Sequence, residues 1–131
     1  MALDYLSISL YIASPNSSVE ELGKLLNCYI TNFHEKGTPI YHKNPRVVYE
    51  ENIVIIDRKL PGDAPLSDLK EAVAFFSPLV NRLLNSGISY NGEIFIGVES
   101  DNGQGEIILE SFLLKEITEL NLDLRFDILL S

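Results

Sequence analysis

The chain has 131 residues, 46% of them hydrophobic, and carries nineteen Asp and Glu against ten Lys and Arg, for a net charge of −9. This length and apolar content suit one folded domain across residues 1–131 and argue against disorder. The acidic surplus repels nucleic-acid phosphates and anionic membranes, so it excludes both as partners and favours a basic protein.

The first expected element is a strand at residues 4–13, where apolar side chains alternate with polar or aromatic ones. A short helix follows and ends near Asn27. Its start is marked by Ser17 or Ser18 with a glutamate three residues later, which is a capping box. The helical residues expected to face the core are Val19, Leu22, Leu25 and Leu26.

Residues 31–46 are rich in glycine, proline and asparagine without a sustained period, so we expect the longest loop of the chain there. Two β-rich segments follow, at residues 46–49 and 52–58. Residues 50–52 fit either a tight turn between two strands or exposed positions in one long strand, and the sequence leaves both alternatives open.

The clearest helical period lies between residues 66 and 84. Ser67 is expected to cap the start of this helix, and Gly87 stands just past its end. Pro78 lies inside the pattern, which predicts a kink near Phe75 or two helices that meet there.

The pattern next predicts a strand at residues 88–99, a hairpin-like loop at 100–105 and a short strand or extended entry at 106–109. A third helix is expected at about 111–120, closed by an asparagine. The last strand, at 122–130, alternates as cleanly as the first.

Terminal strands that alternate in this way belong to a sheet with one solvated face, so helices must cover the other face. The sequence therefore predicts an α+β fold. We expect a two-layer sandwich with a mixed, mainly antiparallel sheet and about three helices on one face.

The order of these elements, together with the segments at 105–114 and 122–128, resembles the bacterial domain-of-unknown-function family 4279. Gly37 matches a glycine that follows the first helix in that family, although residues 41–45 replace an aromatic-rich stretch and the chain has no tryptophan. Such families resemble the immunity proteins of bacterial toxin systems. The resemblance thus implies toxin neutralisation, and it implies no catalytic residues.

Cysteine and histidine do not combine into an evident reactive site. Cys28 is the one cysteine, which excludes an internal disulfide and fits a reducing compartment. Its spacing from His34 and His42 matches no zinc pattern, and a nucleophilic Cys–His pair needs a contact that sequence proximity does not provide. We expect no metal and no cofactor.

Carboxylates and glycines also favour plain interpretations. Glu93 with Glu99, and Asp123 with Asp127, stand too far apart along their strands to share a proton, so a solvated sheet face is expected. The glycine pair at 103–105 lacks the following helix and lysine of a phosphate-binding loop. We therefore expect a binding protein rather than an enzyme.

The N-terminal region and the length of the apolar runs indicate where in the cell the protein is expected. Asp4 stands where a signal peptide would be basic, and no apolar run approaches the roughly 18 residues of a membrane span. We expect a soluble, cytoplasmic protein that does not contact membranes.

Acidic residues dominate the chain after Arg82, where there are nine acidic residues and only two basic ones, Lys115 and Arg125. This skew fits either an ordinary solubilising surface or a patch that pairs with lysine and arginine of a partner. The expected partner-binding residues are the acids Glu93, Glu99, Asp101, Glu106 and Glu110, with Tyr41, Tyr49 and Tyr90 as aromatic anchors.

The leading hypothesis is an immunity protein that binds and neutralises a cognate toxin through an acidic surface. The expected toxin is a basic nuclease of a contact-dependent or polymorphic toxin system. The alternative is a small-molecule-binding or minor enzymatic domain with a cavity between sheet and helices, lined by Tyr5, Tyr11, Phe95 and Phe126. Self-assembly through an edge strand is compatible with either.

Overall fold

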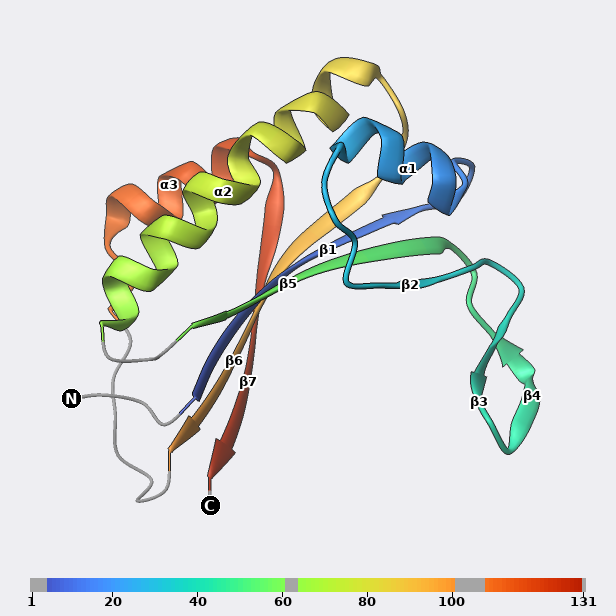
Figure 1. Ribbon diagram of the computed structural model, residues 1–131, viewed down its shortest axis with the longest axis horizontal. Coiled ribbons are helices and arrows are strands. Elements are labelled where there is room, and N and C mark those ends of the chain that lie inside the picture. Colours follow the sequence, from blue (N-terminus) through green and yellow to red (C-terminus); the bar gives the residue numbers. More distant parts are fainter. Residues whose placement is uncertain (1–4, 61–63, 101–107, 131) are drawn as a thin grey trace.

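A computed structural model describes residues 5–60, 64–100 and 108–130 of the chain. Within them, three helices lie along one face of a five-stranded sheet, and a two-stranded hairpin extends from the far end of that sheet on the side away from the helices (Figure 1). The α+β two-layer sandwich predicted from the sequence is confirmed.

The elements follow one another along the chain in the order used for their labels. The helices are α1 (Val19–Leu26), α2 (Pro65–Ser86) and α3 (Ser111–Glu119). The strands are β1 (Tyr5–Ser14), β2 (Asn32–His34), β3 (Pro39–Tyr41), β4 (Asn44–Val48), β5 (Asn52–Leu60), β6 (Asn91–Ser100) and β7 (Leu122–Leu130).

The sheet has the strand order β2-β5-β1-β6-β7, which places the N-terminal strand at its centre. β1 runs antiparallel to both β5 and β6, and β2 runs antiparallel to β5. β6 and β7 are parallel, and the chain between them passes through α3. Parallel neighbours need such a crossover because a tight turn cannot connect them.

The hairpin-like loop expected at residues 100–105 falls between β6 and α3. The loop itself lies largely outside the described residues. Of the short strand or extended entry expected at 106–109, residues 108 and 109 are described, and they belong to no strand. After these residues the chain passes through α3, and the final strand β7 then runs in the same direction as β6.

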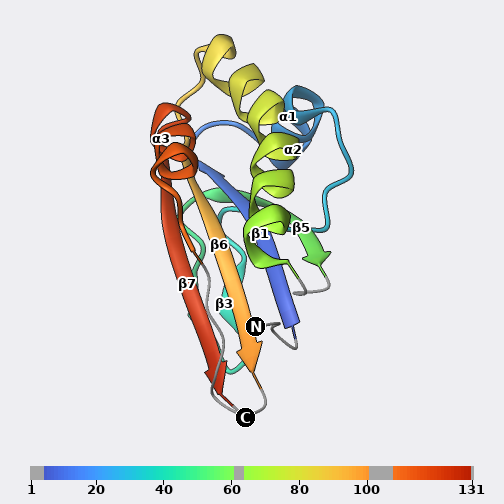
Figure 2. The same cartoon turned by 90° about the vertical axis from the view of Figure 1, so that its left-hand side faces the viewer.

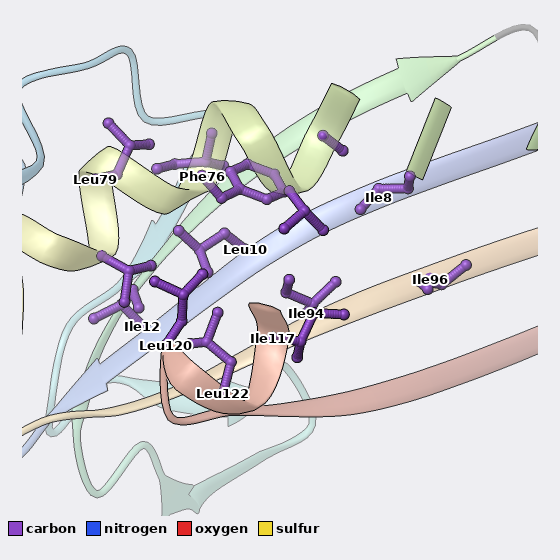
Figure 3. Close-up of a cluster of buried hydrophobic side chains, with 14 of the residues drawn as sticks. Ile8, Leu10, Ile12, Phe76, Leu79, Ile94, Ile96, Ile117, Leu120 and Leu122 are labelled. Carbon is purple, nitrogen blue, oxygen red and sulfur yellow. The ribbon is translucent and has the colours of Figure 1, made fainter. Parts of the chain in front are cut away.

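The core lies between the sheet and the helices and is centred on β1. Leu10 lies opposite Ile56 of β5 and Ile94 of β6, and all three side chains are buried. Figure 3 shows Phe76 of α2 and Ile117 of α3 over these strands. Every helix-facing side chain of β1 between residues 6 and 12 is without exposed surface, namely Leu6, Ile8, Leu10 and Ile12.

The helix α1 has the caps that its sequence predicts. Ser18 is the N-cap, and its Oγ accepts a hydrogen bond from the backbone N–H of Glu21 at 3.1 Å. Asn27 ends the helix in the left-handed region with a φ of 51°, a conformation that asparagine tolerates better than most residues.

The helix α2 differs from its prediction at two points. Pro65 occupies its first turn and Ala64 is the N-cap, so Ser67 lies inside the helix and the capping role expected for it is wrong. α2 also continues through Pro78 as one helix, so the two-helix alternative is wrong. Buried residues on both sides of the proline, including Phe76 and Val80, hold the two halves against the same sheet.

Residues 31–46 do not form the long loop expected from the sequence. β2 pairs with β5 at the edge of the sheet, and β3 and β4 pair with each other in a hairpin, which we call the arm (residues 39–48). A two-residue turn joins the arm strands, and a break at residues 49–51 separates β4 from β5, which settles that open alternative in favour of two strands. Strands of three to five residues are too short to give a period.

The apolar face of β7 is covered only in part. Leu122, at the start of the strand, is 7% exposed, whereas Phe126 and Ile128 are 41% and 62% exposed. Figure 2 shows α3 beside the first half of β7 and the second half of the strand extending beyond the helices. The expectation that helices cover all of this face is therefore wrong for the second half.

Arg82 of α2 ties α1 to the rest of the fold. Its Nε donates a hydrogen bond to the Leu25 carbonyl at 3.0 Å, and its Nη2 donates to the Leu26 carbonyl. These carbonyls belong to the last turn of α1, where the helix itself offers no donors. The guanidinium thus acts as a C-terminal cap supplied by a different helix.

We predict that Arg82→Met lowers the free energy of unfolding by about 1–2 kcal/mol, because the apolar stem is kept but both donors to the α1 carbonyls are lost. Urea denaturation followed by circular dichroism would show this as a lower midpoint at unchanged slope. Lys115→Met, at an exposed position of α3, is the matched control. Equal midpoints for the two variants would contradict the capping role.

Candidate functional site

The side of the five-stranded sheet opposite the helices carries most of the charge of the strands, and we call it the open face. Because side chains alternate along a strand, burial of one set of positions in the core places the intervening set here. The charged residues of the open face are the acids Asp57, Glu93, Glu99, Asp123 and Asp127 and the bases Lys59 and Arg125.

Two aromatic side chains lie in the middle of this acidic face. Tyr11 of β1 and Phe95 of β6 have their ring centroids 5.7 Å apart at an interplanar angle of 36°. Each ring is partly exposed. The open face therefore combines a contact surface of aromatic carbon with carboxylates around it, which is the composition of many protein-binding patches.

The surroundings of Tyr11 shift the pKa of its hydroxyl. Burial raises the pKa of the Tyr11 hydroxyl above its ordinary value, the nearby carboxylates of Asp57 and Glu93 raise it further, and the Arg125 guanidinium lowers it. Arg125 Nη2 lies 3.3 Å from Glu93 Oε2, so this base is already paired with one of the acids. On the other side of Tyr11, Ser9 Oγ donates to Asp57 Oδ1 at 2.5 Å.

A shallow hollow of about 210 Å³ opens on this face beside Tyr11. Its position is at the end of the sheet from which the arm extends, since it includes Ile53 near the start of β5. Small-molecule pockets typically measure 300–1,000 Å³, so the hollow suits one side chain better than a whole ligand. The residues that line it are Tyr11, Ala13, Ile53, Asn91, Gly92, Glu93 and Asp123.

The acids predicted to bind a partner do not form one group. Glu93 and Glu99 lie on the open face. Glu110 instead stands at the N-terminus of α3, where its Oε1 accepts from Lys70 Nζ of α2 at 2.7 Å. Asp101 and Glu106 lie outside the described residues.

The three predicted aromatic anchors have different surroundings. Tyr41 lies on the arm and is 60% exposed. Tyr49 stacks on His34 at the base of the arm, with ring centroids 4.4 Å apart. Tyr90 is half-buried against the core, which raises the pKa of its hydroxyl and leaves the oxygen without a hydrogen-bond partner in the described part of the chain.

Sequence reasoning missed the central members of the open face. Asp57 and Asp123 were not among the predicted binding residues, and Tyr11 was assigned only to the alternative cavity. The alternation of β1 and β5 gives the side on which Tyr11 and Asp57 lie. Glu93 lies opposite Tyr11 on one side and opposite Asp123 on the other. This arrangement follows only from the pairing of β6 with β1 and β7.

The alternative cavity is not formed by the residues expected to line it. Tyr11 and Phe95 point to the open face, whereas Phe126 belongs to the helix-facing set of β7, with Leu124 opposite the buried Ile94. The side chain of Tyr5 lies outside the described residues. These aromatics therefore lie on opposite sides of the sheet instead of around one space.

The cysteine and histidines also lie in separate settings. Cys28 is half-buried beside the core, and burial raises the pKa of its thiol while Arg82 opposes that shift. His34 lies in β2 and stacks on Tyr49, and His42 is in the turn of the arm. Across residues 5–60, 64–100 and 108–130, no three His, Cys, Asp or Glu side chains are grouped to hold a metal ion.

Comparison with known proteins leaves the resemblance to family 4279 as a prediction. No family model, curated protein or solved structure matches the chain. As far as the structure describes the chain, none of its helices has the length and apolar character needed to cross a bilayer.

We predict that Glu93→Gln lowers the pKa of Tyr11, because a carboxylate that disfavours the tyrosinate is removed, whereas Arg125→Gln raises it, because a stabilising cation is lost. Carbon NMR of ring-labelled tyrosine through alkaline pH measures both shifts. Tyr90, whose pKa is raised by burial alone, is the internal control and should titrate alike in all three proteins. Shifts of Tyr11 in the same direction in both variants would contradict the arrangement of the open face.

Proposed function

We propose that this chain is a cytoplasmic immunity protein that neutralises a cognate bacterial toxin domain by binding it with the open face. The single observation that carries the proposal is the concentration of five carboxylates around a partly exposed aromatic pair on a sheet face that no described helix covers. The resemblance to family 4279 supports it.

Charge indicates which toxins the face fits. A nuclease binds nucleic acid with lysine and arginine placed for phosphates. The carboxylates of the open face come from three strands, β5, β6 and β7, and would occupy the positions of those phosphates, so the groove of the toxin would be blocked by a surface of complementary charge. The net charge of −9 would also speed the encounter with a basic domain.

The hollow gives this interaction a specific anchor. A lysine or arginine side chain of the toxin can lay its aliphatic stem against Ala13 and Ile53 while its charged head meets Glu93 and Asp123. Tyr11 adds an aromatic face for a cation–π contact. Such a desolvated charge pair affects dissociation, whereas exposed carboxylates at the rim act mainly on association.

The arm is a second expected contact. It is exposed from residue 39 to residue 47 and includes Ile40, Tyr41 and Val47 among its exposed apolar residues. It carries Lys43 and Arg46, and no acid lies between residues 36 and 48. The arm extends from the end of the sheet where the hollow lies, so a domain seated on the open face would reach it (Figure 1).

We predict that Glu93→Gln with Asp123→Asn raises the Kd for the toxin domain encoded by the adjacent gene roughly 30-fold or more, mainly through faster dissociation. The matched control is Glu20→Gln with Glu119→Gln, which removes the same two charges from exposed positions on α1 and α3. The control should slow association slightly and leave dissociation unchanged. Surface plasmon resonance at two salt concentrations separates the two rate constants.

Growth of cells that express the toxin domain tests the function itself. Wild-type protein and the control variant should protect, and the open-face variant should protect less. If wild-type protein neither binds the toxin nor protects, the immunity function is wrong. If all three proteins bind and protect equally, the function stands and the open face is the wrong surface.

A further inference from the structure

We propose that this chain forms a two-fold symmetric homodimer in which β7 pairs antiparallel with β7 of a second copy, with Phe126 on the symmetry axis. The dimer does not rest on the proposed function, because every observation behind it concerns the edge of the sheet and its sequence.

The first observation is that β7 is a long edge strand. It has nine residues, runs at the end of the strand order, and pairs with β6 on one side. In the described residues no strand pairs with its other side. A long regular edge leaves a row of backbone donors and acceptors for another strand, and natural proteins shield, interrupt or pair such edges.

The second observation is that this edge carries exposed apolar side chains. Phe126 and Ile128 of β7 are 41% and 62% exposed, and Phe112 of α3, the helix that packs beside β7, is 66% exposed. Figure 2 shows α3 and β7 together at one border of the molecule. Burial of these phenylalanine and isoleucine side chains against a second copy removes apolar surface from water and therefore stabilises the dimer.

The third observation is that the charges of β7 select one register with another copy. In a continuous sheet, opposite residues share a face, so each face of β7 must meet the same face of its copy. Centring the pair on Arg125 would oppose two arginines and set Asp123 against Asp127. Centring it on Asp127 would oppose two aspartates.

Centring on Phe126 removes these conflicts. Arg125 then lies opposite Asp127 of the other copy, twice by symmetry, and all nine residues of β7 are aligned. On the helix side, Phe126 meets its own copy and Leu124 meets Ile128. Centring on Leu124 would also pair Arg125 with Asp123, but only residues 122–126 would be aligned and Ile128 would stay unpaired.

This register has a consequence for the assembled surface. The two-fold axis stands perpendicular to the sheet, so the helices of both copies lie on one side and both open faces lie on the other. Two acidic faces then form one continuous ten-stranded surface, with Arg125 and Asp127 where they meet.

Charge reversal tests the dimer without the toxin. Sedimentation of the wild-type chain over a range of concentrations should show a monomer–dimer equilibrium. Asp127→Arg and Arg125→Asp should each weaken the dimer about tenfold or more, because each opposes like charges twice. The double variant restores opposite charges across the axis and should recover dimerisation. Circular dichroism confirms that each variant is folded.

Cysteine crosslinking tests the register, in a Cys28→Ala background. Phe126→Cys places two thiols opposite each other across the axis, close to the Cβ separation that a disulfide needs, and should yield a covalent dimer under mild oxidation. Ile128→Cys, at another exposed position of the same face, faces Leu124 and should not crosslink. A chain that stays monomeric at all concentrations, a double variant that fails to recover, or crosslinking of Ile128→Cys as fast as Phe126→Cys would overturn the proposal.

Discussion

Burial of one face of β1 is the constraint on which the rest of the structure depends. β1 is the central strand, and it pairs antiparallel with β5 and β6 over nearly its whole length. Leu10 and its neighbours on the helix side have no exposed surface. A shift of one residue in this strand would bring Tyr11 into the core and expose the leucines, so the register that fills the core also determines what the open face presents.

The open face follows from this packing because positions excluded from the core are free to be polar. Glu93 and Asp123 need no burial, and the Glu93 carboxylate lies near the partly buried Tyr11 hydroxyl, where burial and this charge favour the neutral phenol. A surface of this kind is costly to the isolated protein through repulsion among its acids. A basic partner would relieve that repulsion, which is the physical reason for linking the acidic face to toxin binding.

The sequence predicted the parts of the fold that depend on local patterns. Strands β1 and β7, the capped helix α1 and the position of α3 follow from alternation, capping residues and helical period, all of which act over a few residues. The β-rich segment predicted at 46–49 overlaps β4, but the arm as a hairpin was missed, because β3 and β4 are held mainly by pairing with each other and a strand as short as β3 carries no period. The parallel arrangement of β6 and β7 was missed because pairing direction depends on contacts between distant segments. The same reason explains the site: Tyr11, Asp57, Glu93 and Asp123 come from four strands and become neighbours only through register.

The most direct measurement of the central claim is an amide NMR titration of the isotope-labelled chain with the cognate toxin domain. Amides of the central strands around Tyr11, Glu93 and Asp123, together with those of the arm around Tyr41, should shift or broaden in proportion to toxin added. Amides on the exposed sides of α1 and α2 should stay unchanged. Perturbation concentrated on those helices, or none anywhere on the open face, would contradict the account.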